Sequence, residues 1–344
     1  MMKITKKVIG SLDRCYSLAL LDYHGTRHLL VAAEKHDNCE MFTLDGKKED
    51  VIWNGPGGVM TMAQVPNTDG VFLATWEFYS PNDSAKARII IAAPDAGGWS
   101  FRTLTDLPFV HRFGILHGSD GDYLIACSLK SAHAFKDDWT CPGRVWGGRL
   151  PTDLSGFDSE HQLPLEPLLS GLGHNHGFCL IDNGRAALVG CDEGVYRVAA
   201  PANGQPWQIR HLFDQPTSDM LLLDLDGDGE RELVTMAPFH GDALTVWHAD
   251  GEGWRRVFVA PRALPFLHAV WGGTLAGRET AVIGYREGDR ELLALRCENG
   301  AYHLTPIDQG AGPANVLHYQ LDGVDIIAAA NRETSEIALY SIES

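Results

Sequence analysis

The chain has 344 residues with 44% hydrophobic content, which is enough to build a sizeable core. Its formal net charge is −17, and it contains no cluster of lysine and arginine, so nucleic-acid binding is not expected. No apolar run reaches the roughly 18 residues of a membrane-spanning helix, which argues against a membrane protein.

The beginning of the chain, MMKITKKVIG, carries lysines but no apolar segment of the kind found in secretory signals. The seven cysteines are odd in number and scattered, and no CxxC motif occurs. Free thiols in a reducing compartment are the natural interpretation, and we expect a cytoplasmic protein.

One unit recurs along the chain: an apolar strand, a short Gly/Asp turn, a second strand of small residues, a polar loop and a third strand. Spacings of about 42 to 65 residues separate the repeats, and no helical period of 3.6 residues is present. The pattern predicts a single all-β domain over residues 1–344, a seven-bladed β-propeller, with a six-bladed ring as the alternative. The equivalent starting positions are Ser17, Val59, His111, His176, Asp219, His268 and Asn315.

The two ends of the chain are expected to complete one blade together. The last repeat has only three strands and ends in EIALYSIES, whereas the leading KITKKVI is a spare strand. We therefore predict that the N-terminal strand closes the last blade. The third repeat is longer than the others, and we predict an insertion at about 131–172 that forms a loop over one face.

The fifth repeat contains an acidic turn, DLDGDGERE, in which carboxylates alternate with glycines. Several closely spaced oxygen ligands on a tight turn suit a hard cation. The turn resembles the FG-GAP or VCBS repeat of integrin-like propellers, and this resemblance implies a structural calcium ion. A plain β-turn without an ion is the alternative. By resemblance the ligands would be Asp224, Asp226, Asp228 and Glu232.

The start of the first strand and the end of the second strand of each blade should share one face of a propeller, opposite the turn that joins them. On successive blades this face would receive His176, His240 and His268, with Asp219 between them. Imidazoles with a carboxylate suit zinc, manganese, iron or nickel, so we predict a transition-metal site formed by these four residues. Satisfied polar histidines are the alternative, and His174 could replace His176.

Other polar side chains are expected around the same funnel. Tyr16 and His111 could move a proton, and Arg112 and Lys130 could stabilise an oxyanion; these four are the predicted catalytic residues. Rim salt bridges are the alternative for the cations, and core packing is the alternative for Trp76, Trp146 and Trp271, which could stack on a sugar. The predicted substrate-binding residues are Lys35, Trp76, Glu77, Arg286 and Arg332. The histidines expected to be solvated are His24, His28, His36, His161, His211, His248 and His303.

A propeller with a histidine-bound metal in its funnel resembles the propeller-fold polysaccharide and oligouronide lyases and the aldos-2-ulose dehydratase type. The resemblance implies a β-elimination: the metal polarises a carbonyl or carboxylate, a base removes the adjacent proton and a leaving group departs. The expected substrate is a small sugar or oligosaccharide. A metal-dependent glycoside or ester hydrolase and a non-catalytic interaction propeller are the alternative functions.

Overall fold

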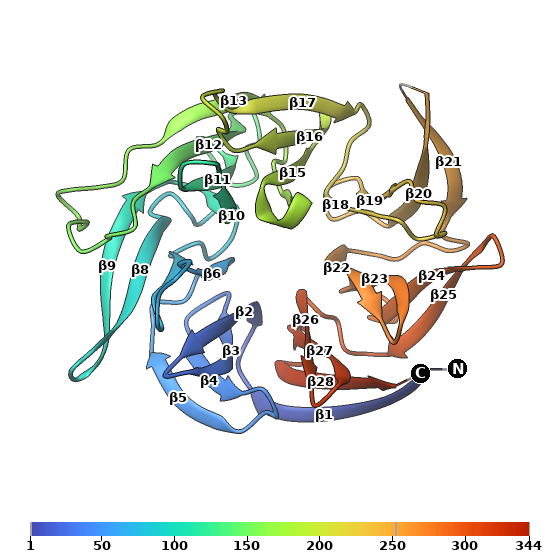
Figure 1. Cartoon of the computed structure of the whole chain (residues 1–344), viewed down its shortest axis with the longest axis horizontal. Helices are drawn as coiled ribbons and strands as arrows, with labels where there is room; N and C mark the ends of the chain where they lie inside the picture. Colours follow the sequence, from blue (N-terminus) through green and yellow to red (C-terminus); the bar gives the residue numbers. More distant parts are fainter. Residues whose placement is uncertain (1, 252, 344) are drawn as a thin grey trace.

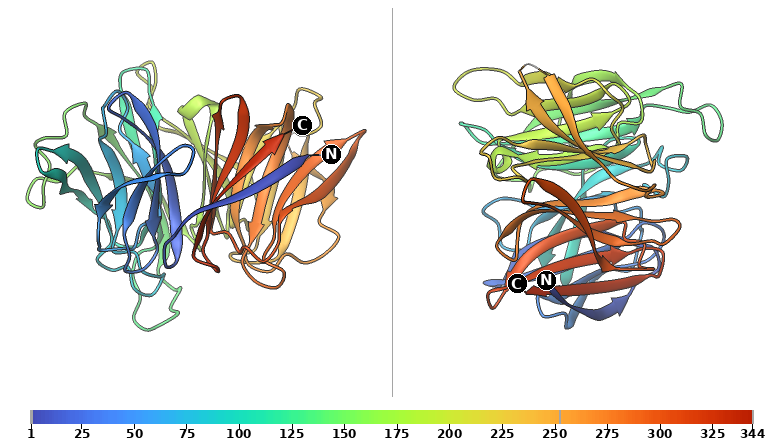
Figure 2. Two further views of the ribbon diagram at one scale, coloured as in Figure 1. Left: turned by 90° about the horizontal axis from the view of Figure 1, so that it is seen from below. Right: turned by 90° about the vertical axis from the view of Figure 1, so that its right-hand side faces the viewer.

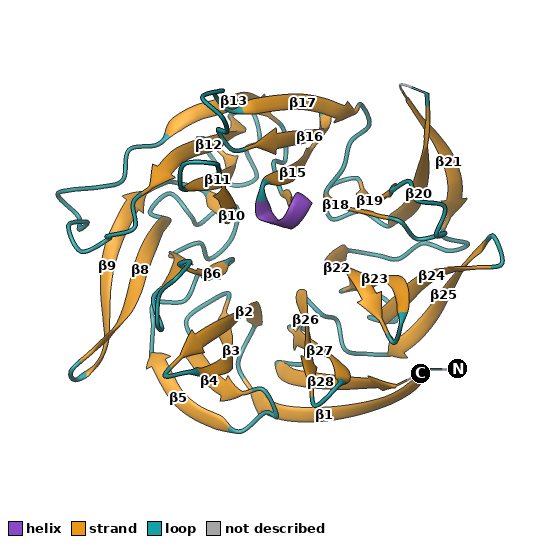
Figure 3. Ribbon diagram, viewed as in Figure 1, coloured by secondary structure: helices purple, strands orange, loops and turns teal. Residues whose placement is uncertain are grey.

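The computed structural model describes residues 2–251 and 253–343, which form seven four-stranded antiparallel sheets around a central axis (Figure 1). Strands and loops make up nearly the whole ring, as Figure 3 shows, and the described residues contain one short 3-10 helix at Asp182–Gly184. No helix in this part of the chain is long and apolar enough to cross a membrane. The predicted all-β seven-bladed propeller is confirmed.

Six blades take four consecutive strands each. The first comprises β2 (Cys15–Tyr23), β3 (Thr26–Ala33), β4 (Cys39–Thr43) and β5 (Lys48–Trp53), and the second β6 (Met62–Gln64), β7 (Phe72–Trp76), β8 (Arg88–Asp95) and β9 (Gly98–Asp106). The third comprises β10 (Val110–His117), β11 (Asp122–Lys130), β12 (Pro142–Leu150) and β13 (Glu166–Leu172), and the fourth β14 (Gly177–Ile181), β15 (Ala186–Cys191), β16 (Gly194–Ala199) and β17 (Gln208–Phe213). The fifth comprises β18 (Asp219–Leu223), β19 (Glu232–Ala237), β20 (Ala243–Asp250) and β21 (Gly253–Val259), and the sixth β22 (Leu267–Leu275), β23 (Arg278–Tyr285), β24 (Leu292–Glu298) and β25 (Ala301–Asp308).

The seventh blade joins the two ends of the chain. It consists of β26 (Asn315–Leu321), β27 (Val324–Asn331), β28 (Glu336–Glu343) and the first strand, β1 (Lys3–Ser11). β1 runs antiparallel to β28, and Figure 2 shows the first and last strands side by side. The ring is therefore closed by main-chain hydrogen bonds between the N-terminal and C-terminal strands, as the sequence predicted.

Apolar side chains fill the spaces between neighbouring blades. In β27, Ala328 and Ala330 belong to the same apolar cluster as Val31 of the first blade. The alternate residues Ile327 and Ala329 belong to a cluster with the sixth blade. The second strand of a blade is thus buried on both faces, which explains why its sequence is continuously apolar instead of alternating.

Replacing Ile337 with alanine should destabilise this closure. Ile337 lies on β28, is fully buried, and packs in the cluster between the seventh and first blades. Removing its side-chain carbons leaves a cavity, so the free energy of unfolding should fall by about 2–5 kcal/mol in urea titrations. The matched control is Val8→Ala on the paired strand β1: Val8 is half exposed, and this change should cost about 0.5 kcal/mol or less. Equal losses in the two variants would contradict the described packing.

The long third repeat contains less irregular chain than the sequence suggested. The predicted insertion at about 131–172 includes β12 and β13, the third and fourth strands of the blade. The irregular parts are the two connections 131–141 and 151–165. The repeat is longer because these connections are long, and not because a whole segment is added to the blade.

The register of the first two strands fixes which residues share a face. In the fifth blade Asp219 at the start of β18 lies opposite Met236 near the end of β19, and in the fourth blade Gly177 lies opposite Gly190. We call the face that holds the starts of the first strands and the ends of the second strands the site face. The acidic turn 224–231, which joins β18 to β19, lies at the opposite end, which we call the turn face.

Candidate metal centre

Three histidines from successive blades meet on the site face. His176 directly precedes β14, His240 follows β19, and His268 is the second residue of β22. Each offers one ring nitrogen, and these nitrogens lie within 4.8 Å of one another. Ligands of a zinc ion with bonds of about 2.0–2.1 Å would lie about 3.4 Å apart, which is within this limit. We call these residues the histidine cluster.

His176 is oriented like a metal ligand: one ring nitrogen contacts neighbouring residues, and the other is free within the described part of the chain. Its ring is 1% exposed, and Nδ1 lies 2.9 Å from Oδ2 of Asp219 and 3.3 Å from the carbonyl oxygen of Ser218. Nε2 is buried and has no hydrogen-bond partner among the described residues. A ligating histidine commonly directs its other nitrogen to a carboxylate, which sets the tautomer. Nε2 is therefore available to a cation.

The position of Asp219 corrects one prediction. It was expected to bind the metal, but it is not among the grouped ligand atoms, and its carboxylate lies behind His176. The alternation along β18 brings the aspartate to the site face but does not specify its distance from the cluster. Oδ2 of Asp219 lies 2.9 Å from Nδ1 of His176 but has no hydrogen-bond partner among the described residues, so Asp219 can position His176 only through this electrostatic contact. His174 forms a separate pair, with Nδ1 2.7 Å from Oδ2 of Asp192.

Tyr16 connects the histidine cluster to His111. Its hydroxyl lies 3.1 Å from Nε2 of His268 and 3.3 Å from Nε2 of His111. Nδ1 of His268 lies 2.6 Å from the carbonyl oxygen of Ala314, to which it must donate. Nε2 of a neutral His268 is then an acceptor, so Tyr16 donates to it. A metal bound at this nitrogen would displace that hydrogen bond and leave the phenol beside the ion.

β-Bulges direct these side chains inward. The pairing register shifts at Tyr16 in β2, at His111 in β10 and at His268 in β22, so the same irregularity recurs in the first, third and sixth blades. An extra residue in one strand re-aims its side chain, and here the three side chains meet one another across the ring. This equivalence explains how residues that are far apart in the sequence form one hydrogen-bonded group.

His240 completes the cluster from a loop. It adopts a φ of 50°, a conformation in which histidine is several-fold enriched among non-glycine residues. Its ring stacks between Phe239, at 3.9 Å between centroids, and Phe266, at 4.3 Å. The guanidinium of Arg286 covers the Phe266 ring at 4.4 Å. Aromatic stacking therefore holds a partly exposed ligand in place.

Burial keeps the rings of this group neutral. It lowers the pKa of His240 to about 2, with further contributions from His176 and Arg286, and it lowers the pKa of His111 and His268 well below the usual value. Burial also raises the pKa of Tyr16 to about 12, which keeps the phenol protonated at neutral pH. Neutral imidazoles are the form that binds a metal.

These pKa values predict acid lability of the metal-free protein. Because the folded pKa values lie below the unfolded value near 6.5, the stability contribution is fully present above about pH 6.5. As the pH falls from there towards the folded values, the free energy of unfolding should decrease by about 1.4 kcal/mol per pH unit for each histidine. Urea titrations after chelation would measure this. The His240→Asn variant should give a shallower slope, and an unchanged slope would contradict neutral burial of His240.

Most of the other predicted rim residues have structural partners. Lys130 is fully buried, and its Nζ donates to Oδ1 of Asn82 at 3.0 Å and to the carbonyl of Asp138 at 3.1 Å. It is therefore part of a loop anchor and does not support the predicted catalytic role. Among the predicted substrate-binding residues, Arg332 pairs with Glu34 and Glu333, Arg286 with Glu333, and Glu77 with Arg88; Lys35 donates to the Tyr79 carbonyl, and Trp76 packs on Trp53 and Phe101.

Arg112 differs from these cations. Its Nη1 donates to the carbonyl oxygen of Met60 at 3.2 Å, and its guanidinium lies 5.8 Å from the centre of the Tyr16 ring. No carboxylate forms an ion pair with it among the described residues. The remaining guanidinium hydrogens are available beside the Tyr16 and His111 pair.

The acidic turn is organised differently from the prediction. Two donor sets overlap there: one comprises Asp224, Asp226 and Asp228, and the other comprises Asp226, Glu232 and His248. The sequence interpretation missed His248, which was expected to be solvated but lies 2.9 Å from Oδ2 of Asp228. His248 lies on β20, which pairs with β19. This pairing lies outside the acidic motif, and it is the feature that could have identified His248 from the sequence. His28 was also expected to be solvated, but it is buried and lies 3.0 Å from Glu49.

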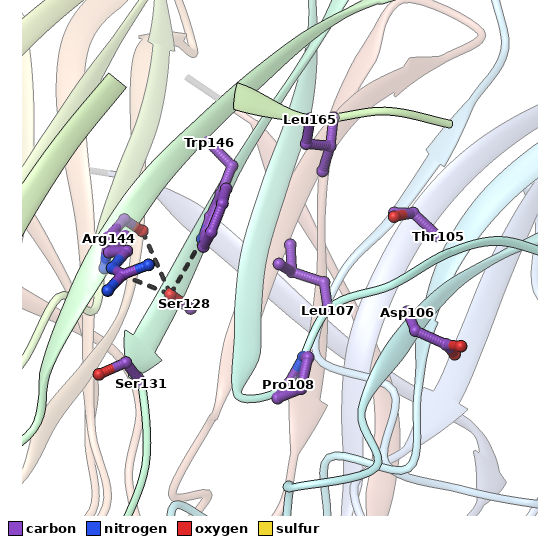
Figure 4. Close-up of a pocket in the computed structure, with 9 residues that line it drawn as sticks. All are labelled: Thr105, Asp106, Leu107, Pro108, Ser128, Ser131, Arg144, Trp146 and Leu165. Atoms are coloured by element: carbon purple, nitrogen blue, oxygen red, sulfur yellow. Dashed lines mark hydrogen bonds between the residues drawn. The ribbon is translucent and has the colours of Figure 1, made fainter. Parts of the chain in front are cut away.

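A separate pocket of about 420 Å³ lies between the second and third blades (Figure 4). Arg144, Trp146 and Ser128 form one wall, and Asp106 lies on the other. Trp146 donates from Nε1 to Oγ of Ser128 at 3.2 Å, and the Arg144 guanidinium lies 5.6 Å from the centre of the Trp146 ring. No residue of the histidine cluster lines this pocket. Trp271, the other tryptophan considered for stacking, packs beside His318 at 4.6 Å.

No family model matches the chain, and no curated protein matches it. Among solved structures it is similar to the β-propeller domain of Cps50 (Swd1) from Myceliophteria thermophila. The TM-score is 0.62 with 10% sequence identity, and the alignment covers 97% of this chain and 99% of that one. At this identity the likeness concerns the fold alone, and it agrees with the strand topology: the chain is an all-β seven-bladed β-propeller.

Proposed function

We propose that this protein is a metal-dependent carbon–oxygen lyase or dehydratase that acts on a small sugar derivative in the funnel of the site face. The observation that carries the proposal is the buried, unpartnered Nε2 of His176, a residue whose ring lies in one ligand group with His240 and His268 and whose Nδ1 lies 2.9 Å from Oδ2 of Asp219. An orphaned buried imidazole nitrogen is costly unless a ligand satisfies it. Three histidines that converge on one point suit zinc, manganese, iron or nickel with open positions for substrate.

The residues beside the cluster fit proton transfer. A bound metal would polarise a substrate carbonyl or carboxylate. His111, which is neutral, would accept the proton from the adjacent carbon, the electron pair would form a carbon–carbon double bond, and the β carbon–oxygen bond would break. The leaving oxygen would then take up a proton. Tyr16 contacts both His111 and His268, so a proton could pass between these rings.

The charge around the funnel favours an acidic or carbonyl-bearing substrate. Arg112 has guanidinium hydrogens free beside Tyr16, and a planar guanidinium suits a carboxylate. A uronide or a keto-sugar would present such a group next to an acidic carbon–hydrogen bond. The architectural resemblance to propeller-fold sugar lyases suggests the same substrate class. The resemblance of the acidic turn to FG-GAP or VCBS repeats concerns a structural cation and does not bear on the substrate.

Product analysis tests the proposal. Purified protein, reconstituted with zinc, manganese, iron or nickel in separate samples, would be incubated with a panel of uronides, keto-sugars and small glycosides. Elimination gives an unsaturated or keto product with new ultraviolet absorbance. Products that have taken up water would favour the metal-dependent hydrolase instead. Absence of stoichiometric transition metal from protein grown in metal-replete medium would contradict both and favour a non-catalytic interaction propeller.

A further inference from the structure

A second group of metal-ligating atoms lies on the turn face, away from the histidine cluster. It comprises Asp226 in the acidic turn, Glu232 at the start of β19 and His248 on β20. One ligand atom from each lies within 4.8 Å of the others. All three belong to the fifth blade, and the antiparallel pairing of β19 with β20 brings the histidine beside the turn.

Glu232 provides an unsatisfied acceptor at the base of this group. Its side chain is 0% exposed, and Oε2 accepts a hydrogen bond from the main-chain nitrogen of Leu225 at 2.7 Å. Oε1 is buried and has no hydrogen-bond partner among residues 2–251 and 253–343. It lies 3.7 Å from Nε2 of His248. A buried carboxylate oxygen without a partner is unfavourable, and a cation would satisfy it.

The orientation of His248 also leaves a position for a cation. Its Nδ1 lies 2.8 Å from the carbonyl oxygen of Ala249 and must donate to it. In the neutral ring, Nε2 then carries a lone pair directed at carboxylate oxygens, 2.9 Å from Oδ2 of Asp228 and 3.7 Å from Oε1 of Glu232. Acceptors that face one another repel unless a proton or a metal ion lies between them. A proton on Nε2, donated to Asp228, or a metal ion would each resolve this contact, whereas the unpartnered Oε1 of Glu232 is satisfied only by a cation or a further donor.

The sixth blade contributes a further polar atom. Tyr302 lies on β25, where its ring packs against the apolar cluster between the fifth and sixth blades. Its hydroxyl is buried and has no partner in the described part of the chain. Burial raises the pKa of Tyr302, and the nearby carboxylates of Glu232 and Asp226 raise it further.

We propose that Asp226, Glu232 and His248 bind a divalent transition metal, zinc or manganese, which is distinct from the metal of the histidine cluster. The imidazole decides the class of ion, because calcium prefers six to eight oxygen ligands, whereas zinc and manganese accept nitrogen with carboxylate oxygen. The ion fastens the acidic turn to β20. This site does not depend on the proposed lyase activity, because it lies at the other end of the blade.

Isothermal titration of chelator-treated His240→Ala protein tests this site, since that background weakens the histidine cluster. Zn²⁺, Mn²⁺ and Ca²⁺ are titrated separately, and thermal unfolding is measured with each ion. We expect one Zn²⁺ or Mn²⁺ per chain and a rise in Tm. His248→Asn should weaken binding by at least about tenfold and abolish the rise in Tm. The matched control is His318→Asn, which breaks a similar histidine–carboxylate pair with Asp325 in the seventh blade and should leave binding unchanged.

A Glu232→Gln variant keeps the test decisive if His248→Asn does not fold. Glutamine has the same shape and removes the unpartnered charge, so the metal-free protein should remain folded and lose only the metal-dependent rise in Tm. Absence of Zn²⁺ and Mn²⁺ binding would overturn the proposal. Binding of Ca²⁺ that survives His248→Asn but is lost in Asp224→Asn would also overturn it, in favour of a calcium ion on the outer carboxylates Asp224, Asp226 and Asp228.

Discussion

Replacing His240 with alanine should remove the metal from the site face and abolish the proposed activity. The substitution deletes one of three ligands, and metal affinity should fall by more than about 100-fold, because loss of an outer hydrogen-bond partner alone costs 10–100-fold. The metal is expected to stabilise the transition state by several kcal/mol, so its loss should decrease kcat by about 10³-fold or more. Metal titration and the elimination assay of the native protein measure the two effects. His240 is partly exposed, so the fold should survive.

The matched control for His240→Ala is His174→Ala. His174 lies beside the cluster, stacks on Phe239 at 4.7 Å and pairs with Asp192, but it is not among the grouped ligand atoms. Its removal should leave the metal in place. Asp219→Asn should give an intermediate result, with affinity reduced about 10–100-fold because His176 loses its orienting carboxylate. Equal metal loss in His174→Ala and His240→Ala would contradict the ligand assignment.

Replacing Tyr16 with phenylalanine should separate proton transfer from metal binding. The variant keeps the buried ring and removes the hydroxyl that contacts His111 and His268. Metal content should be unchanged, whereas kcat should fall by about 10²–10⁴-fold, the usual contribution of a general acid or base. The measurement is kcat at saturating substrate across a range of pH, with metal content determined in parallel.

The pH profile distinguishes proton transfer from a structural role of Tyr16. If the phenol moves a proton, the Tyr16→Phe profile should lose one limb that the native enzyme shows. A uniformly lower profile of the same shape, or a loss of metal in the variant, would contradict a role in proton transfer. Serine at position 17 offers a nearby control: it is also buried, but Ser17→Ala removes a hydroxyl that has no part in the Tyr16 contacts.

The fold could be predicted from the sequence because each blade repeats the same local chemistry. Apolar second strands, such as VDIIAAAN in β27, are buried on both faces, and Gly/Asp turns mark the strand ends. The N-terminal strand KITKKVI was left over after the repeats were assigned, and it pairs with the free edge of the last repeat at β28. The length of the third repeat was misinterpreted because Gly-rich and Trp-rich strands such as PGRVWGGRL lack the usual alternation.

The site was predictable only in outline. The position of His176, His240 and His268 within their repeats predicted that they share one face, because strand direction and alternation determine that face. The position within a repeat does not distinguish a metal ligand from a residue that contacts a ligand. Asp219 was therefore predicted to be a ligand. The β-bulges at Tyr16, His111 and His268 leave no pattern in the sequence, and the burial of Lys130 depends on Asn82 of another blade.

Anomalous scattering from crystals of protein loaded with zinc, measured on both sides of the zinc absorption edge, tests the central claim most directly. We expect an anomalous peak about 2.0–2.1 Å from Nε2 of His176 and from a ring nitrogen of each of His240 and His268. A well-ordered crystal in which these three imidazoles surround no anomalous peak would contradict a metal centre on the site face.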